Sequence, residues 1–252
     1  MRILAAARSD VGKRRKDNED RFQIVEASGF YGVCDGMGGH AAGEIAASVA
    51  LEAAERIVRH RPWVGQKFLK EGGSIEPVMN LLDRAVRVAN AEVFDLSLEN
   101  RAYHQMGCTM TLLLHLGDSA VLASVGDSRF YLVRGHEVRQ LTLDHTIGAE
   151  FQRSGLPVPD AMAGTRYTRL LSRSIGTAET VRADVFPLKL NAGDRFVICT
   201  DGLSDYLGDG RPLVAATQKG SPDQVAERLV NFANESGGAD NVTVVVGFVE
   251  DE

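Results

Sequence analysis

Residues 30–40 read FYGVCDGMGGH and carry the chain from a strand through an acidic turn toward a helix. Phe30 to Cys34 is a short apolar run typical of a strand, and Asp35-Gly36 follows it directly. From Ala42 onward, apolar residues recur at near-helical spacing. This stretch predicts that Asp35 lies at the end of a strand, at one edge of a sheet.

The rest of the chain extends this pattern in both directions. Upstream, a run at 22–26 is separated from Phe30 by three small residues, as in a hairpin. Downstream, amphipathic helices are predicted at 42–60 and 75–98, on either side of the breaker-rich stretch 62–73. Further strands are predicted at 3–7, 109–116, 120–125, 130–133, 137–141, 185–188, 195–199 and 242–249, with a helix at 222–236.

Short glycine-containing turns between neighbouring strands imply antiparallel pairing. Runs of strands interrupted by paired helices favour an α+β fold, with antiparallel sheets covered by helices, over an alternating parallel sheet. A length of 252 residues with 44% hydrophobic and 25% charged residues is typical of one domain, spanning 1–252. Residues 145–172, rich in Gly and Pro, read as an irregular excursion, a flap beside a site.

Composition argues against several classes of function. A net charge of -6 with a pI near 5.6 does not provide the basic surface that nucleic acid requires. Cys34, Cys108 and Cys199 sit in apolar runs and cannot all pair, which favours a reducing, cytoplasmic setting. No stretch approaches the ~20 apolar residues of a membrane span, and the apolar N-terminus is too short for a signal peptide. We expect a soluble monomer that binds neither nucleic acid nor membranes.

Acidic residues stand where apolar runs end, and this is the most informative feature of the sequence. They are Asp35 after a strand, Asp127 between two strands, Asp201 after 196–200, Asp240 before the last strand, and Asn18-Glu19-Asp20 before 22–26. Any one Asp-Gly pair is more often a turn than a ligand. Turn chemistry does not require aspartate at four strand ends, however, and gathered carboxylates repel unless a cation neutralises them.

A metal site is therefore the better interpretation, and the donor types indicate which metal. The sequence has no Cys-x-x-Cys, no His-x-x-x-His and no close His pair, whereas oxygen donors abound. The hard cations Mg²⁺ or Mn²⁺ fit best. Calcium is disfavoured because the acidic residues are dispersed over more than 200 positions. Gly36, which lacks a side chain, would let a backbone carbonyl approach the ion held by Asp35.

Six motifs follow one another along nearly the whole chain. They are Asp10-x-Gly12-x-x-Arg15-x-x-Asn18-Glu19-Asp20, Asp35-Gly36-Met37-Gly38-Gly39-His40-x-x-Gly43-Glu44, Gly107-x-Thr109, Gly126-Asp127-Ser128-Arg129, Asp201-Gly202-Leu203-x-Asp205 and Asp240-Asn241-x-Thr243. In this order they resemble the metal-dependent protein phosphatase (PPM) family in its bacterial serine/threonine form. The combination is specific, although each motif alone is weak.

The resemblance implies a four-layer α-β-β-α sandwich with a two-metal centre at one end. It also implies a role for each matched residue. Asp35 would bridge two ions and Gly36 would add its carbonyl, Asp201 and Asp240 would hold one ion, and Glu19 or Asp20 would hold the other partly through water. Asp127 would share a weaker third position with Asp201, and Arg15 would bind phosphate. The implied substrates are proteins bearing phosphoserine or phosphothreonine, and the implied partner is a bacterial-type serine/threonine kinase that the enzyme opposes.

These implied roles agree with general phosphoryl chemistry. Two cations about 4 Å apart lower the pKa of a bridging water, which attacks phosphorus in line without a covalent phosphoenzyme. The planar guanidinium of Arg15 suits phosphate because it donates two parallel hydrogen bonds, which lysine cannot copy. His40 has two readings, a general acid for the leaving group or a local role at the helix start.

The flap keeps the family's order but carries no specificity signal. Its basic residues, with those just after it, would attract a phosphopeptide locally or be solvated; they are Arg153, Arg166, Arg169 and Arg173. The remaining histidines, at 60, 104, 115, 136 and 145, are scattered and receive no role.

Two alternative functions stay open. A non-catalytic relative that binds phosphoproteins would keep the fold and lose metal ligands, and no such loss is visible. A metal-dependent phosphodiesterase or nuclease would use a similar two-metal site. The negative net charge weighs against the second alternative.

Overall fold

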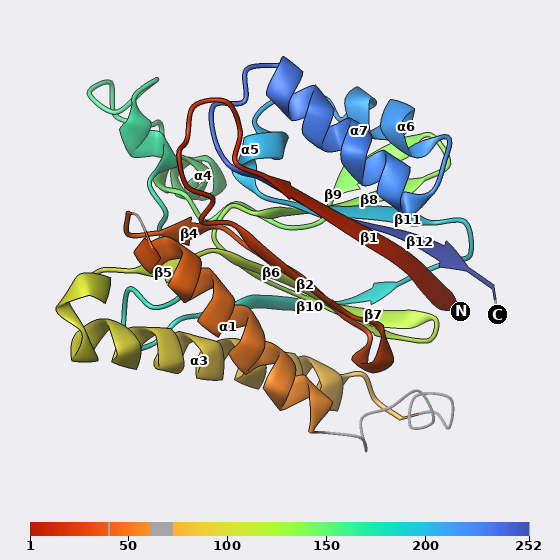
Figure 1. Cartoon of the computed structure of the whole chain (residues 1–252), viewed down its shortest axis with the longest axis horizontal. Coiled ribbons are helices and arrows are strands. Elements are labelled where there is room, and N and C mark those ends of the chain that lie inside the picture. The colour runs from red at the N-terminus through yellow and green to blue at the C-terminus, as the bar shows by residue number, and fades with distance from the viewer. Residues whose placement is uncertain (40, 61–72, 252) are drawn as a thin grey trace.

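In the computed structural model, which describes residues 1–39, 41–60 and 73–251, two antiparallel sheets pack face to face between helical layers (Figure 1). One sheet has the order β1 (Arg2–Asp10), β12 (Val242–Glu250), β11 (Arg195–Cys199), β8 (Arg129–Arg134) and β9 (Glu137–Gln140). The other has the order β10 (Asp184–Lys189), β7 (Ser119–Val125), β6 (Met110–Leu116), β3 (Phe30–Cys34) and β2 (Arg21–Val25). The predicted four-layer sandwich is confirmed.

The core between the sheets is built around aromatic side chains. Phe130 stacks on Phe196 with ring centroids 5.4 Å apart, and Tyr31 meets Phe196 edge-on at 5.9 Å. Every residue of β3 and of β6 is buried. Strands buried on both faces read as continuous apolar runs, which is why the sequence shows these strands as runs and not as alternation.

Two helical layers close the outer faces of the sheets. α1 (Ala41–Arg59) and α3 (Glu76–Glu99) cover the sheet that contains β3, and small buried residues such as Ala50 and Ala85 let them pack closely. α7 (Pro222–Glu235) covers the other sheet and begins with a capping box between Ser221 and Gln224. No helix in the described ranges is both long and apolar enough to cross a membrane.

The predicted strands and long helices agree with the structure, and the elements that prediction missed are short. They are η1 (Glu26–Ser28), η3 (Arg101–Tyr103), the ribbon of β4 (Gly36–Met37) and β5 (Gly107–Cys108), α4 (Ile147–Ser154), α5 (Asp201–Ser204) and α6 (Arg211–Thr217). The last three contain too few residues for a clear apolar period. The breaker-rich stretch 62–73 lies almost wholly outside the described residues.

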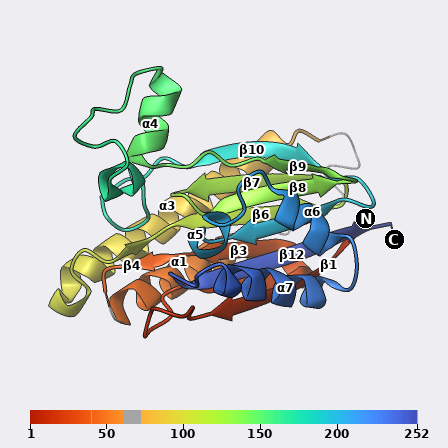
Figure 2. The same ribbon diagram turned by 90° about the horizontal axis from the view of Figure 1, so that it is seen from above.

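The predicted irregular excursion at 145–172, called the flap below, is partly helical, and its description as irregular is wrong there. α4 buries no residue but is capped by the Thr146 side chain and by Gly155 in the left-handed region. η4 (Arg166–Arg169) follows it. The two stems of the flap are joined where the Ile147 amide donates to the Leu170 carbonyl at 2.9 Å. The flap projects from the end of the sandwich that carries β4 (Figure 2).

Candidate metal centre

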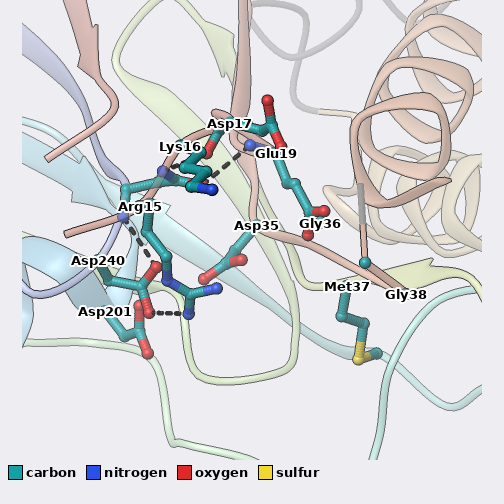
Figure 3. Close-up of a pocket in the computed structure, with 12 residues that line it drawn as sticks. Arg15, Lys16, Asp17, Glu19, Asp35, Gly36, Met37, Gly38, Asp201 and Asp240 are labelled. Carbon is teal, nitrogen blue, oxygen red and sulfur yellow. Dashed lines mark hydrogen bonds and ion pairs between the residues drawn. The ribbon is translucent and has the colours of Figure 1, made fainter. Parts of the chain in front are cut away.

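One end of the sandwich brings four separated chain segments around an open pocket of about 440 Å³ (Figure 3). Asp35 follows β3, Asp201 is the first residue of α5 after β11, and Asp240 lies just before β12. The complete lining is Arg15, Lys16, Asp17, Glu19, Asp35, Gly36, Met37, Gly38, Gly39, Asp201, Asp240 and Asn241. The predicted convergence of acidic strand ends is therefore present at this edge.

Arg15 faces the pocket and is held by one of the carboxylates. Its Nη2 donates to Asp240 Oδ2 at 2.7 Å, and this hydrogen bond raises the pKa of Arg15 above its usual value. The side chain is still 54% exposed. A guanidinium that is oriented by one partner but open to solvent can meet an incoming anion.

Asp35 lies at the centre of the cluster and is fixed by backbone contacts. Its amide donates to Thr109 Oγ1 at 2.9 Å, and its carbonyl accepts from the Thr109 amide at the same distance. Burial raises the pKa of Asp35 well above the ordinary value, and the charges of Asp20 and Asp201 raise it further. A deprotonated carboxylate at this position requires a nearby positive charge.

Asp20 and Asp127 do not line the pocket; Asp20 is buried and Asp127 is partly buried. Burial raises the pKa of Asp20 to about 7, against a hydrogen bond that Thr200 donates to its Oδ2 at 2.8 Å. Burial and then the charge of Asp201 raise the pKa of Asp127 to about 7. Burial, followed by the charge of Asp240, raises the pKa of Asp201 to about 6.

Two buried oxygens of this cluster have no hydrogen-bond partner among the described residues, Asp20 Oδ1 and Asp201 Oδ1. Orphaned carboxylate oxygens and raised pKa values are the features expected where oxygen ligands await a hard cation. No three His, Cys, Asp or Glu side chains of the described ranges are by themselves arranged to hold an ion. A complete ligand set therefore depends on further oxygen donors, such as the Gly36 carbonyl and water.

Glycine at two of the acidic turns is required by close backbone packing. A Cβ on Gly36 would lie 2.2 Å from the Gly43 carbonyl oxygen and 2.6 Å from that of Glu19. A Cβ on Gly202 would lie 1.9 Å from the Asn241 carbonyl oxygen. The glycine next to Asp35 thus lets helix α1 and the Glu19 loop approach it, a reason that the sequence alone did not give.

Asn241 is a functional residue that prediction from sequence missed, although it stands in the last motif. Its side-chain amide donates to the Val11 carbonyl at 3.0 Å and to the Asp17 carbonyl at 2.9 Å, while Oδ1 accepts from the Glu19 amide at 2.9 Å. Asn241 therefore fixes the loop that carries Arg15 and Glu19. These partners are more than 220 positions away in the chain, so no local pattern indicates them.

Most predicted site residues thus lie together, and some predictions need correction. Arg15, Glu19, Asp35, Gly36, Asp201 and Asp240 line the pocket, while Asp20 and Asp127 do not line it but are near enough for their charges to raise the pKa of Asp35. Their roles as ligands stay predictions, and His40 lies outside the described residues. Of the four arginines predicted either to attract a phosphopeptide or to be solvated, three are ion-paired: Arg153 with Glu150, Arg169 with Asp205 and Arg173 with Asp184.

Comparison with known proteins agrees with this geometry. Residues 11–232 match the family described as protein phosphatase 2C, and the chain belongs to that family, as its motif order predicts. It is 34% identical over 246 residues to the serine/threonine protein phosphatase PstP of Mycobacterium tuberculosis, covering 98% of this chain and 45% of PstP. It is 29% identical over 247 residues to the protein phosphatase PhpP of Streptococcus pneumoniae, covering 97% and 96% of the two chains.

A solved structure of similar fold contains metal. The catalytic domain of PstP in complex with 2 manganese ions has a TM-score of 0.82 and 34% identity to this chain, covering 99% of each. The present chain spans less than half of full-length PstP, because its match covers 45% of that protein.

Proposed function

We propose that this chain is a metal-dependent protein phosphatase that hydrolyses phosphoserine and phosphothreonine on proteins. The observation that carries the proposal is the meeting of Arg15 with Asp35, Asp201 and Asp240 around one pocket. A polar, acidic pocket with one oriented arginine suits a small anionic group better than an apolar ligand. Membership in the protein phosphatase 2C family and the names of PstP and PhpP support the same activity.

The proposed cofactor is a pair of Mn²⁺ or Mg²⁺ ions, with a weaker third. Asp35 would contribute to both ions and Gly36 would add its carbonyl. Asp201 and Asp240 would hold one ion, Glu19 or Asp20 the other partly through water, and Asp127 with Asp201 the third. When bound, such ions activate water and neutralise charge on the transferring phosphoryl group. The manganese in the PstP structure supports this choice.

Residues of the chain would bind and orient the phosphate group of the substrate. Arg15 lies beside the pocket and would donate hydrogen bonds to phosphate oxygens, with Asp240 fixing the direction of the guanidinium. Asn241 holds the Arg15 loop against the sandwich, so the arginine keeps its position relative to the carboxylates. The products are the free hydroxyl of serine or threonine and inorganic phosphate, and His40 remains the candidate proton donor to the leaving oxygen.

The proposed setting follows from the same features. The three cysteines are free and buried, which is compatible with a reducing cytoplasm. We propose a monomer made of one catalytic domain that acts against bacterial-type serine/threonine kinases. A comparison of phosphoproteomes with and without active protein would identify both the substrates and the kinase.

The proposed activity is tested by comparing ester types under one metal condition. Purified protein with Mn²⁺ should hydrolyse p-nitrophenyl phosphate and phosphothreonine peptides, leave bis(p-nitrophenyl) phosphate and single-stranded DNA nearly intact, and lose activity on chelation. Asp201→Asn should abolish turnover, while Asp118→Asn, in an exposed turn away from the pocket, should not. Preference for the diester would favour the phosphodiesterase alternative, and an inert protein that still binds phosphopeptides would favour the non-catalytic one.

A further inference from the structure

His145, the first residue of the flap, is completely buried and contacts the turn that carries Asp127. Its backbone amide donates to the Gly126 carbonyl at 2.9 Å, and its Nδ1 accepts from the Gly126 amide at 3.1 Å. Both polar backbone groups of Gly126 are thus held by one residue. Because Asp127 follows Gly126 directly, His145 fixes the backbone from which the Asp127 carboxylate extends.

The other side of the imidazole contacts residues beyond the flap. With Nδ1 accepting, the ring proton lies on Nε2, which donates to Asp184 Oδ2 at 3.2 Å. Arg173 donates to Asp184 Oδ1 at 2.9 Å, and the His145 carbonyl accepts from the Ser172 amide at 2.8 Å. Arg173 and Ser172 belong to the returning stem of the flap and its continuation. The anchoring of the flap and the Gly126 turn therefore share one side chain.

The Gly126 turn also contacts the residue that fixes Asp35. Gly126 has a φ of 98°, and a Cβ there would lie 2.6 Å from Thr109 Cγ2, so only glycine fits this position. Thr109 Oγ1 accepts from the Asp35 amide at 2.9 Å and pairs with Ser128 Oγ at 2.7 Å. A displacement of Gly126 would thus reach Asp127 directly and Asp35 through Thr109.

We propose that His145 is a positioning residue that couples the anchoring of the flap to the affinity of the ion position containing Asp127. Gly126 transmits its effect to Asp127, and Asp184 with Arg173 ties the same imidazole to the flap stem. The inference rests on the proposed function, since it assumes that Asp127 is a metal ligand. A buried histidine that served stability alone would lower the unfolding temperature without changing the affinity for the ion.

The test uses equilibrium Mn²⁺ binding to the full chain, followed by the electron paramagnetic resonance signal of free Mn²⁺. Two variants separate the hydrogen bond with Gly126 from the hydrogen bond with Asp184. His145→Asn places an acceptor oxygen near the position of Nδ1, which contacts Gly126. His145→Gln places an amide donor near the position of Nε2, which contacts Asp184. His145→Ala removes both. Asp194→Ala is the matched control, because Asp194 is also buried and is ion-paired with Arg134. Asp194 directly precedes β11, at the opposite end of that strand from Asp201.

We expect His145→Ala and His145→Gln to weaken the weakest Mn²⁺ association by about 10- to 100-fold, as for residues that orient metal ligands. His145→Asn keeps an acceptor for the Gly126 amide but loses the Asp184 link, so it should weaken the same association by a smaller factor. Asp194→Ala should lower the unfolding temperature with wild-type Mn²⁺ binding. Wild-type affinity in the Asn variant, or in both the Ala and Gln variants, would overturn the inference. If His145→Ala does not fold, the Asn and Gln pair still decides. Failure of the wild-type protein to bind any Mn²⁺ would instead refute the proposed function.

Discussion

The metal-centre end of the sandwich and the flap lie beside each other but are built differently. β3 and β11, which lead to Asp35 and Asp201, and β12, which starts just after Asp240, are mostly buried, whereas α4 of the flap buries no residue and depends on its caps and stems. Segments with few buried apolar contacts open at low free-energy cost. The acidic cluster is thus placed beside buried strands, whereas the flap, which has few buried contacts, is the segment better able to vary.

The largest expected effect is on the rigid side of this comparison, at Arg15. Arg15→Lys keeps the charge beside Asp240 but loses the planar fork, so the fold should be unchanged while kcat/KM for a phosphothreonine peptide falls. Loss of one charge-assisted hydrogen bond corresponds to roughly 10- to 100-fold. Steady-state kinetics with saturating Mn²⁺ measure this, and near-normal turnover would refute the phosphate-binding role.

The next effect is a pH-dependent stability of the acidic cluster. The pKa of Asp20 is raised from 3.8 to about 7 by burial, so its stabilising contribution is present below its unfolded pKa and is lost as pH rises toward 7. In metal-free protein, wild type should therefore lose stability relative to Asp20→Asn across this window, by a few kcal/mol at about 1.4 kcal/mol per pKa unit. Urea unfolding of both proteins at several pH values measures the difference, and a constant difference would contradict the raised pKa.

A smaller effect is expected at Asn241, which attaches the Arg15 loop to the rigid end. Asn241→Asp still accepts from the Glu19 amide but cannot donate to the Val11 and Asp17 carbonyls. Loss of these two partly buried hydrogen bonds, at about 0.5–1.5 kcal/mol each, should lower the free energy of unfolding by about 1–3 kcal/mol, and KM for phosphopeptide should rise as Arg15 loses its position. Thermal unfolding and kinetics together test this. An unchanged KM would mean that the loop holds itself in place.

The smallest effect is expected on the flap. Among the described residues Arg166 has no ion pair and lies 5.7 Å from the Tyr167 ring centroid, whereas Arg169 pairs with Asp205. Arg166→Ala should raise KM for an acidic phosphopeptide by about two- to fivefold, the range of exposed charge contacts, and leave p-nitrophenyl phosphate unaffected. Arg169→Ala is the comparison variant, because it removes an arginine that is already paired with Asp205. Equal changes with both substrates would place Arg166 in the chemistry and not in recognition.

The same comparison explains what could be predicted from sequence. Strands such as β3 and β11 are buried on both faces and end at Asp35 and just before Asp201, so apolar runs and acidic ends were both visible. α4 has no buried face and hence no apolar period, and its caps alone did not suffice to predict a helix.

Contacts between distant residues were beyond sequence reasoning for a different reason. Nothing near Asn241 indicates that its amide holds a loop at 11–19, and nothing near His145 indicates that it holds Gly126. Both residues act through hydrogen bonds to backbone groups, which any residue type at the partner position could offer. The pairing of Arg169 with Asp205 and of Arg173 with Asp184 likewise depends on where the chain folds back, whereas Arg153 and Glu150 are three residues apart within α4.

The most direct measurement is the equilibrium binding of Mn²⁺ by isothermal titration calorimetry to wild type, Asp35→Asn and the exposed control Asp118→Asn at neutral pH. If the acidic strand ends form the metal centre of a phosphatase, wild type and Asp118→Asn bind Mn²⁺ with equal affinity and Asp35→Asn loses that binding. Wild-type binding by Asp35→Asn would contradict the assignment of the cluster as the metal centre.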